Sequence, residues 1–151
     1  MKKIMFVQKL KNGELVTEGI WCIEHEDGCF IIDNIPFIAR NIACGDKIKI
    51  EFSEEDNNNY FDSIVSASGN STIRVYFDST ENIESTREIL NGMKCESEVF
   101  LSKMIIAVNI PKDTNYIPIK KFLDEGEDKG KWEYEESCLS HNPANGLSSL
   151  S

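Results

Sequence analysis

The sequence predicts an α+β protein built from two parts that differ in the spacing of their apolar residues. In residues 1–68, short apolar runs are separated by turn signals such as "NG" at 12–13 and "CGD" at 44–46, a spacing typical of short antiparallel strands. In residues 69–139, strand-like runs alternate with two segments of helical spacing. With 151 residues, of which 40% are apolar, the chain can bury a core in one domain or in two small, closely packed subdomains.

The first part, residues 1–68, is expected to form a small antiparallel β-barrel-like subdomain. Its strands are predicted at about residues 3–10, 17–25, 29–33, 47–53 and 60–67. Pro36 follows the third strand and lacks the backbone N–H that a sheet ladder needs, so the chain must leave the sheet there. We therefore expect "DNIPFIAR", residues 33–40, to turn the chain at a corner of the barrel and to pack through its apolar middle.

The second part, residues 69–139, is expected to be a ferredoxin-like βαββαβ subdomain. Its first strand, "STIRVYF", alternates apolar Ile73 and Val75 with Arg74 and Tyr76, as a half-buried strand should. The order of its elements predicts an antiparallel sheet with both helices on one face. Arg74 and Tyr76 should then project from the opposite face, toward the first part.

Two helices and three further strands complete the second part. Ser79 or Thr80 can cap the first helix, and the second is expected to begin at Asn115. The runs "CESEVFL" and "KMIIAVNI" predict a hairpin between the helices, and "KWEYEESCL" predicts the closing strand. Residues 140–151 are small and polar and are expected to form a flexible tail.

The charge balance narrows the function classes. The chain has 26 acidic and 16 basic residues, a net charge of -10, which disfavours a protein whose main task is to neutralise nucleic-acid phosphates. It has no signal-peptide pattern and no apolar stretch near the roughly 20 residues that span a bilayer, so we expect a cytoplasmic protein without a membrane partner. The favoured function is a non-catalytic protein-binding module of the immunity or inhibitor type, whose acidic surface masks a basic partner.

Three segments carry a resemblance to a known family: "DNIPFIARNIACGDKI", "SGNSTIRV" and "YEESCLSH", in this order over most of the chain. They resemble an uncharacterised bacterial family of domains of unknown function, whose members share Asn-Ile-Pro-Phe, Ser-Gly-x-Ser-Thr and Tyr-Glu-Glu motifs. The resemblance implies no reaction. Many relatives carry His where this chain has Asn70, so the resemblance supplies no general acid or base at that position.

The alternative function is an enzyme or a small-ligand-binding domain with its site in the seam between the two parts. Glu136 is expected to share a face with the aromatic residues of its strand and to pair with Arg40 or Arg74, because a carboxylate among aromatics needs a cationic partner. The candidate seam residues are Asp33, Asn34, Phe37, Arg40, Asn70, Ser71, Arg74, Tyr76 and Glu136.

The sequence supports a catalytic or an RNA-binding function less well than a protein-binding one. Only His25 and His141 supply imidazole, and "GNSTI" around Ser71 is not the Gly-x-Ser-x-Gly nucleophile elbow, so we expect neither a catalytic residue nor a cofactor. An RNA-associated regulator would stack bases on Tyr76 from the open sheet face, but the sequence lacks the basic surround that this needs.

The five cysteines have scattered spacings and no Cys-x-x-Cys pair, which predicts reduced thiols rather than a disulfide framework. Cys22, His25 and Cys29, with Cys44 as a fourth ligand, form a conceivable tetrahedral zinc set. Their spacing straddles a predicted hairpin turn instead of a short ligand knuckle. We therefore expect strand cysteines in the core and no metal site.

Overall fold

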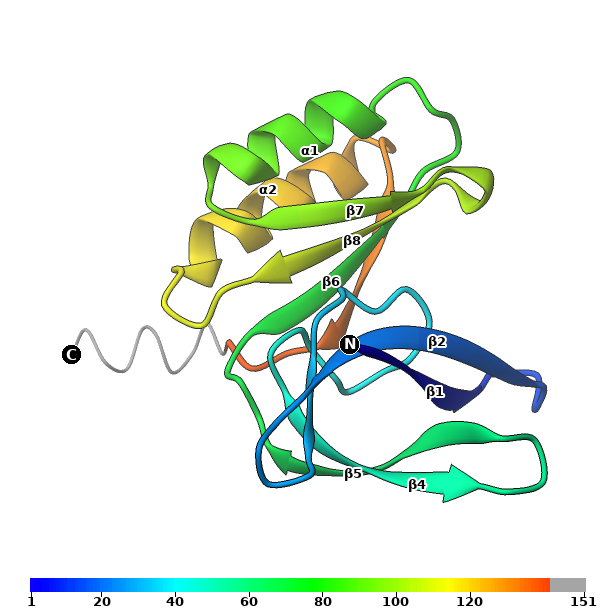
Figure 1. The fold of residues 1–151 in the computed structure, drawn as a ribbon. Coiled ribbons are helices and arrows are strands. Elements are labelled where there is room, and N and C mark those ends of the chain that lie inside the picture. The colour runs from blue at the N-terminus through cyan, green and yellow to red at the C-terminus, as the bar shows by residue number, and fades with distance from the viewer. Residues whose placement is uncertain (142–151) are drawn as a thin grey trace.

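Two sheets and two helices make up the computed structural model, which describes residues 1–141. Both helices cover the outer face of one sheet, and the other sheet lies across its inner face (Figure 1). The α+β class predicted from the sequence is therefore confirmed. The first sheet contains β1 (Lys2–Lys9), β2 (Leu15–Glu24), β3 (Phe30–Ile32), β4 (Lys47–Ser53) and β5 (Asn58–Ser66). The second contains β6 (Ser71–Tyr76), β7 (Glu96–Phe100), β8 (Ile105–Ile110) and β9 (Glu133–Cys138), with helices α1 (Ile83–Gly92) and α2 (Tyr116–Asp128).

The first sheet closes on itself, but not as a regular antiparallel barrel. Its strands follow chain order from β1 to β5, and each consecutive pair is antiparallel. β1 then meets β5 in parallel, through only the pairs Ile4–Asn59 and Met5–Tyr60. The expectation of an antiparallel barrel is wrong at this closing pair, because an odd number of up-and-down strands brings the first and last together in the same direction.

The core of the first sheet also contains two residues from outside its strands. Alternate positions of β1, β2, β3 and β4 supply most of it, and the Phe6 ring stacks on Phe61 with centroids 4.9 Å apart. Ala39 and Ile42, from the connection between β3 and β4, are buried in the same cluster. This connection, residues 33–46, is called the bridging loop below. As predicted for "DNIPFIAR", it leaves the sheet after β3 and packs.

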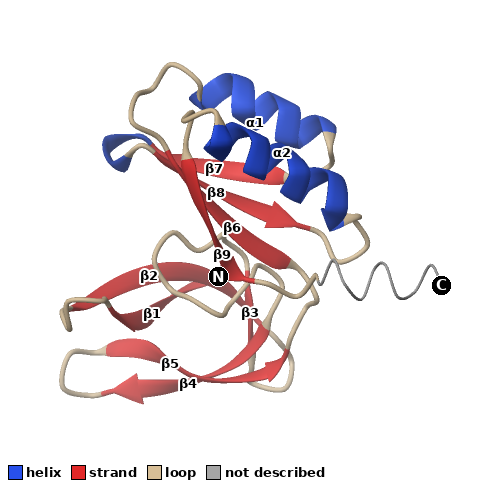
Figure 2. Cartoon of the chain, turned by 180° about the vertical axis from the view of Figure 1, so that it is seen from behind, coloured by secondary structure: helices blue, strands red, loops and turns tan. Residues whose placement is uncertain are grey.

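The second sheet has the strand order β7-β8-β6-β9, with every neighbouring pair antiparallel. α1 connects β6 to β7 past the intervening β8, and α2 connects β8 to β9 past β6, both on one face of the sheet (Figure 2). Ile73, Val75 and Phe77 point toward these helices and join the core there. The alternation predicted for β6 is therefore present in the structure.

The two helices begin by different means. Asn115 caps α2 as predicted, since its side chain accepts a hydrogen bond of 3.1 Å from the backbone N–H of Ile117. α1 begins at Ile83, after Asn82, which makes no side-chain cap hydrogen bond. The expected cap at Ser79 or Thr80 is wrong, because those residues belong to the preceding turn, and the Thr86 hydroxyl instead donates to the Asn82 carbonyl.

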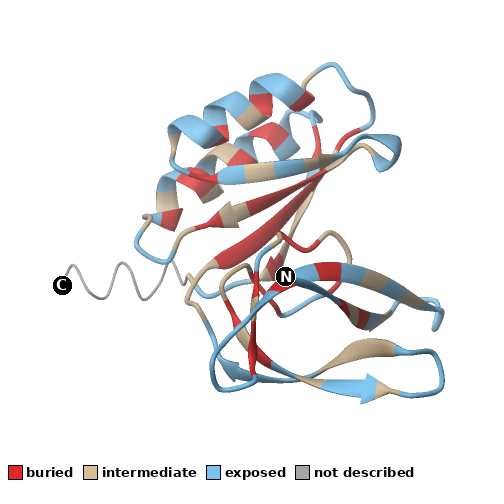
Figure 3. Cartoon of the chain, viewed as in Figure 1, coloured by how far each residue is buried: buried red, intermediate tan, exposed pale blue. Residues whose placement is uncertain are grey.

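Strand β6 is buried on both faces. Residues 71–75 are all buried, and Figure 3 shows β6 as a continuous buried strand between the helices and the first sheet. Because the helices cover only one face, the bridging loop must cover the other. Within residues 1–141, no helix is long and apolar enough to cross a membrane.

Candidate functional site

The bridging loop is held to the first sheet by one carboxylate. Glu18 on β2 accepts hydrogen bonds from the backbone N–H groups of Phe37 (2.8 Å), Ile38 (2.9 Å) and Ala39 (2.9 Å). Three consecutive donors on one charged acceptor fix the path of the loop after Pro36, where it could not join a strand. Glu18 was not among the sequence candidates, because nothing in its own strand signals this contact.

The same loop is also bonded to the second sheet. The Thr72 hydroxyl donates to the carbonyl of Ile42 at 3.1 Å, and the backbone N–H of Asn41 donates to the carbonyl of Ser137 at 3.0 Å. Buried Asp46, at the end of the loop, accepts from the N–H of Ser68 at 2.8 Å in the connection between the sheets. The bridging loop thus forms the seam between the two sheets.

Arg74 lies at the centre of this seam and is 1% exposed. Its Nε donates to Oε1 of Glu135 at 2.8 Å, while its Nη2 donates to the carbonyl of Ala39 at 3.2 Å and to the hydroxyl of Ser137. Its Nη1 has no hydrogen-bond partner among the described residues. Arg74 therefore binds β9 and the bridging loop at once, and keeps one donor group unused.

Glu135 is the common partner of the polar and charged side chains in the seam. It accepts from the Tyr76 hydroxyl at 2.6 Å and forms a second ion pair with Arg40 at 3.5 Å. Burial by itself raises the pKa of Glu135, but the Tyr76 hydrogen bond and the charges of Arg74 and Arg40 outweigh it, so the pKa is lowered. Burial and the same carboxylate raise the pKa of Tyr76 to about 12, so Tyr76 stays protonated and donates.

An open cavity of about 280 Å³ lies beside this network. It is called the seam cavity below. Its lining residues come from both sheets and from the bridging loop: Leu10, Val16, Phe37, Ile38, Arg40, Arg74, Tyr76, Phe100, Lys103, Ile105 and Glu135. At its wall the rings of Phe37 and Phe100 meet edge-on, with centroids 5.6 Å apart. The seam is therefore packed by the bridging loop without being closed.

The structure brings four of the sequence candidates together around the seam cavity: Phe37, Arg40, Arg74 and Tyr76. Asn34 instead accepts a hydrogen bond from the backbone N–H of Trp21 at 2.9 Å. Because Arg74 is 1% exposed under the bridging loop, its guanidinium presents no open flat face on which a base could stack.

Glu136 lies on the other side of the second sheet. It accepts from the Tyr116 hydroxyl at 2.6 Å and pairs with Lys120 of α2 at 3.5 Å. The expected ion pair of Glu136 with Arg40 or Arg74 is wrong, and its neighbour Glu135 takes that place. The reason is strand alternation: Trp132 belongs to the core under the helices, so the residues that share its face point there as well. The burial of Trp132 was the signal that could have identified Glu135.

Asn70 and Ser71 bond to backbone groups around the start of β6. The Asn70 amide donates to the carbonyl of Cys44 at 2.8 Å and accepts from the N–H of Lys112 at 2.9 Å. Ser71, which is 0% exposed, accepts from the N–H of Ser140 at 2.9 Å. Both side chains thus hold chain segments together.

The Ser71 hydroxyl also pairs with a histidine. It lies 2.6 Å from Nδ1 of His141, whose Nε2 lies 2.8 Å from the carbonyl of Pro111. In the neutral imidazole, Nε2 donates to this carbonyl, which can only accept, and Nδ1 then accepts from Ser71. The hydroxyl is buried and its bonds are occupied, so it is held as a structural group. Of the predicted tail, residues 140 and 141 are thereby fixed, and 142–151 lie outside the described residues.

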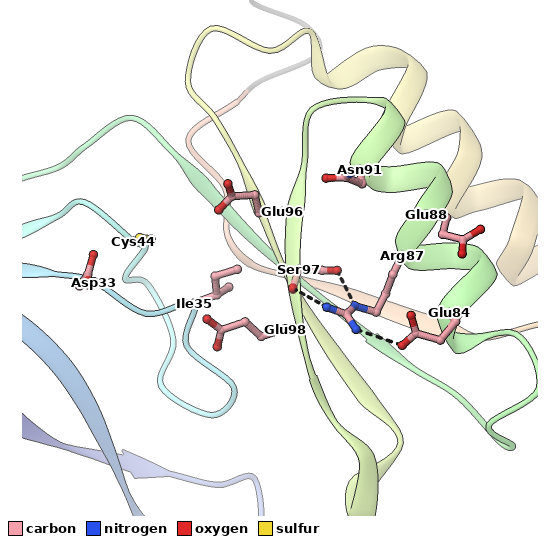
Figure 4. A pocket seen from close by; sticks show the side chains of 10 residues that line it. All are labelled: Asp33, Ile35, Cys44, Glu84, Arg87, Glu88, Asn91, Glu96, Ser97 and Glu98. Carbon is pink, nitrogen blue, oxygen red and sulfur yellow. Dashed lines mark hydrogen bonds and ion pairs between the residues drawn. The ribbon is translucent and has the colours of Figure 1, made fainter.

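Asp33 belongs to a second hollow, which shares no lining residue with the seam cavity. It has a volume of about 470 Å³ and is called the acidic groove below. It is lined by Asp33, Ile35, Cys44, Glu84, Arg87, Glu88, Asn91, Glu96, Ser97 and Glu98. Figure 4 shows Asp33 and Cys44 on one side and the α1 side chains on the other, with Glu96 and Glu98 of β7 between them.

The cation of the acidic groove is already engaged. Arg87 pairs with Glu84 at 3.0 Å and donates to the hydroxyl and the carbonyl of Ser97, both at 3.0 Å. Loss of hydration raises the pKa of Glu98. The negative charges of Asp33 and Glu96 raise this pKa further, and Arg87 only partly opposes the rise. The groove therefore concentrates negative charge that its own arginine does not balance.

The described residues contain no group of three or more His, Cys, Asp or Glu side chains placed to hold a metal ion. His25, from the conceivable zinc set, lies 3.1 Å from Asp27 instead. Burial raises the pKa of Cys22 to about 12 and that of Cys95 to about 11, so these thiols stay protonated and unreactive. All five cysteines are free.

Comparison with known proteins gives a family and a fold. A crystal structure described as that of a hypothetical protein from Neisseria gonorrhoeae is similar, with a TM-score of 0.79 and 23% sequence identity, over 93% of this chain and 96% of that chain. That likeness shows the fold alone. A search of curated proteins finds no match. The model of a domain of unknown function, DUF4265, matches residues 18–134, and the chain therefore belongs to this family, as the resemblance of its motifs predicted.

Proposed function

We propose that the protein is a non-catalytic binding module of the immunity or inhibitor type, which holds a basic segment of a partner protein in the acidic groove. The observation that carries this proposal is the composition of the groove: five carboxylates and one guanidinium line it. Complementary charge of this kind steers a basic partner to its site and favours it over other partners.

The groove offers carboxylates from three directions. Asp33 comes from the bridging loop, Glu88 from α1, and Glu98 from β7. Within residues 1–141, none of these three side chains forms an ion pair. Arginine or lysine side chains of a partner could therefore bind here without displacing an internal cation, which keeps the cost of binding low.

A non-catalytic role is supported by the state of the nucleophile candidates. Ser71 is buried and hydrogen-bonded on all sides, and burial keeps the thiols of Cys22 and Cys95 protonated. Such groups do not reach a substrate.

We also infer a finer description of the fold. The division at residue 68 separates a small barrel-like unit from a ferredoxin-like unit in residues 69–139. The strand order β7-β8-β6-β9 supports this, because each helix then connects two strands with one strand between them, as in split βαβ folds. The unit differs from an isolated ferredoxin-like domain in that the bridging loop covers its open face.

The proposed function predicts selective binding of basic peptides. An octa-arginine peptide added to the ¹⁵N-labelled protein should shift the amide signals of Asp33, Glu88 and Glu98 before those of the first sheet. The triple variant Glu88→Gln, Glu96→Gln and Glu98→Gln should weaken binding roughly three- to hundredfold, because each lost charge contact contributes about 0.2–1 kcal/mol. A calorimetric titration measures this difference.

The matched control removes the same charge elsewhere, with Glu54→Gln, Glu55→Gln and Asp62→Asn on the exposed surface of the first sheet. If the control weakens binding as much as the groove variant does, the affinity for the peptide depends on the net charge of the protein alone, and the proposal fails. Because the pKa of Glu98 is raised and a bound cation favours its charged form, affinity should fall as the pH is lowered from 7 to 5. Cross-linking in the native host then identifies the partner.

A further inference from the structure

We infer that the seam cavity is a second binding site, for a small amphipathic carboxylate whose charged end meets Arg74 and Arg40 and whose apolar part lies against Phe37 and Phe100. This site is separate from the acidic groove. It has the opposite charge and is lined by a different set of residues.

The strongest observation is the unused donor of Arg74. Arg74 is 1% exposed and is one of the residues that line the cavity, and its Nη1 has no partner among the described residues. Buried polar groups are nearly always hydrogen-bonded, because an unpaired one forfeits its hydration without compensation. An acceptor that enters the cavity would supply the missing partner. A carboxylate suits this best, because it matches the fork geometry of guanidinium.

The charge of the cavity points to an anion. Arg40, Arg74 and Lys103 line it, against the single carboxylate of Glu135. This excess of cations occurs in a chain whose net charge is -10. Glu135 is already shared between Tyr76 and the two arginines, so it neutralises only part of their charge. A bound carboxylate would restore the balance.

The rest of the wall is apolar. Leu10, Val16, Ile38 and Ile105 surround the two phenylalanine rings, and side chains of this kind bind hydrocarbon by removing it from water. At about 280 Å³ the cavity lies at the small end of ligand pockets, which range from roughly 300 to 1,000 Å³. The ligand class is therefore a short-chain or single-ring acid.

The test is a titration of the ¹⁵N-labelled protein with sodium octanoate, up to about 10 mM, which covers the millimolar affinities of small ligands. Saturable shifts should appear at Ile38, Arg74, Phe100 and Ile105. Octan-1-ol should bind at least roughly tenfold more weakly, since it lacks the charged acceptor, and octylamine should not saturate the site.

Two variants, each with a matched control, locate the site without disturbing buried Arg74. Arg40→Gln should weaken octanoate roughly two- to fivefold, whereas the control Lys49→Gln, on exposed β4, should not. Leu10→Trp fills the cavity and should abolish saturation, while Leu15→Trp, whose side chain is exposed and outside the cavity, should leave it intact. The inference is overturned if octanol binds as tightly as octanoate, if the shifts lie elsewhere, or if Leu10→Trp binds octanoate normally.

Discussion

Arg74 shows how one side chain can join two sheets. Its guanidinium donates hydrogen bonds to Glu135 on β9 and to Ala39 in the bridging loop. The side chain is buried from solvent. A buried charge is tolerated when the surrounding structure supplies its hydrogen bonds. Removal of one partner leaves the remaining polar groups buried without a hydrogen bond.

We predict that Arg74→Met lowers the free energy of unfolding by about 2–3 kcal/mol. This is less than the 3–5 kcal/mol typical of a broken buried pair, because Glu135 keeps part of its hydration. Urea denaturation measures the loss. The control Arg87→Met breaks a surface pair with Glu84 and should cost at most about 1 kcal/mol; equal losses in both variants would contradict the role of Arg74.

The same pair should give a pH dependence. The pKa of Glu135 is lowered in the folded protein, so the stability it contributes is present above its ordinary pKa of about 4.3 and is lost as the pH falls through the lowered value. The destabilisation caused by Arg74→Met should therefore be largest near pH 7 and shrink at strongly acid pH.

At the scale of single elements, α2 depends on one glycine. A Cβ atom on Gly126 would lie 1.8 Å from the Trp132 ring, far inside contact distance. The glycine lets the helix approach the indole, whose Nε1 donates to the carbonyl of Leu123 at 3.0 Å. The close contact fixes how α2 lies on the sheet.

We predict that Gly126→Ala destabilises the protein by about 1–3 kcal/mol through overpacking, although alanine is the better helix former by about 1 kcal/mol. The matched control is Gly92→Ala at the end of α1, where a Cβ meets nothing within 4 Å. It should be neutral or slightly stabilising. Thermal unfolding of both variants checks the contrast, and a stabilised Gly126→Ala variant would show that Trp132 can move aside.

The elements were largely predictable because their signals are local. The alternation of apolar and polar residues predicted β6, and Asn115 indicated the start of α2. The start of α1 was missed because several small polar residues precede it and none of them forms the cap hydrogen bond. The parallel contact of β1 with β5 depends on how the whole sheet curls, which no short pattern encodes.

The candidate site was predictable only in part. Arg74, Tyr76 and Phe37 could be placed at the seam because alternation and Pro36 give directions for their side chains. Glu18 and Glu135 were missed, since their partners are distant in sequence and acidic residues are too numerous in this chain for one to stand out. Which of the two adjacent glutamates faces the seam depends on Trp132, because its place in the core under the helices sets the orientation of β9.

The whole molecule should unfold as one cooperative unit, because the bridging loop supplies Ala39 and Ile42 to the core of one sheet and hydrogen bonds to the other. The chain has two tryptophans, Trp21 on β2 and Trp132 beside α2. Each therefore reports on one sheet.

We predict that the single-tryptophan variants Trp21→Phe and Trp132→Phe each unfold in urea at the same midpoint by fluorescence and by far-ultraviolet circular dichroism. Coincidence of two probes is the usual test of a two-state transition. A lower midpoint for Trp21 fluorescence than for circular dichroism in the Trp132→Phe variant would mean that the first sheet melts alone, and that the loop does not couple the two.

The position of β9 has a consequence for synthesis on the ribosome. β6 lies in the middle of the second sheet, yet one of its neighbours, β9, comes last in chain order among the strands of residues 1–141. Until β9 emerges, Arg74 lacks Glu135 and Ser137, and Ser71 lacks His141. The nascent second sheet and the seam should therefore remain incomplete until residues 133–141 have left the ribosome.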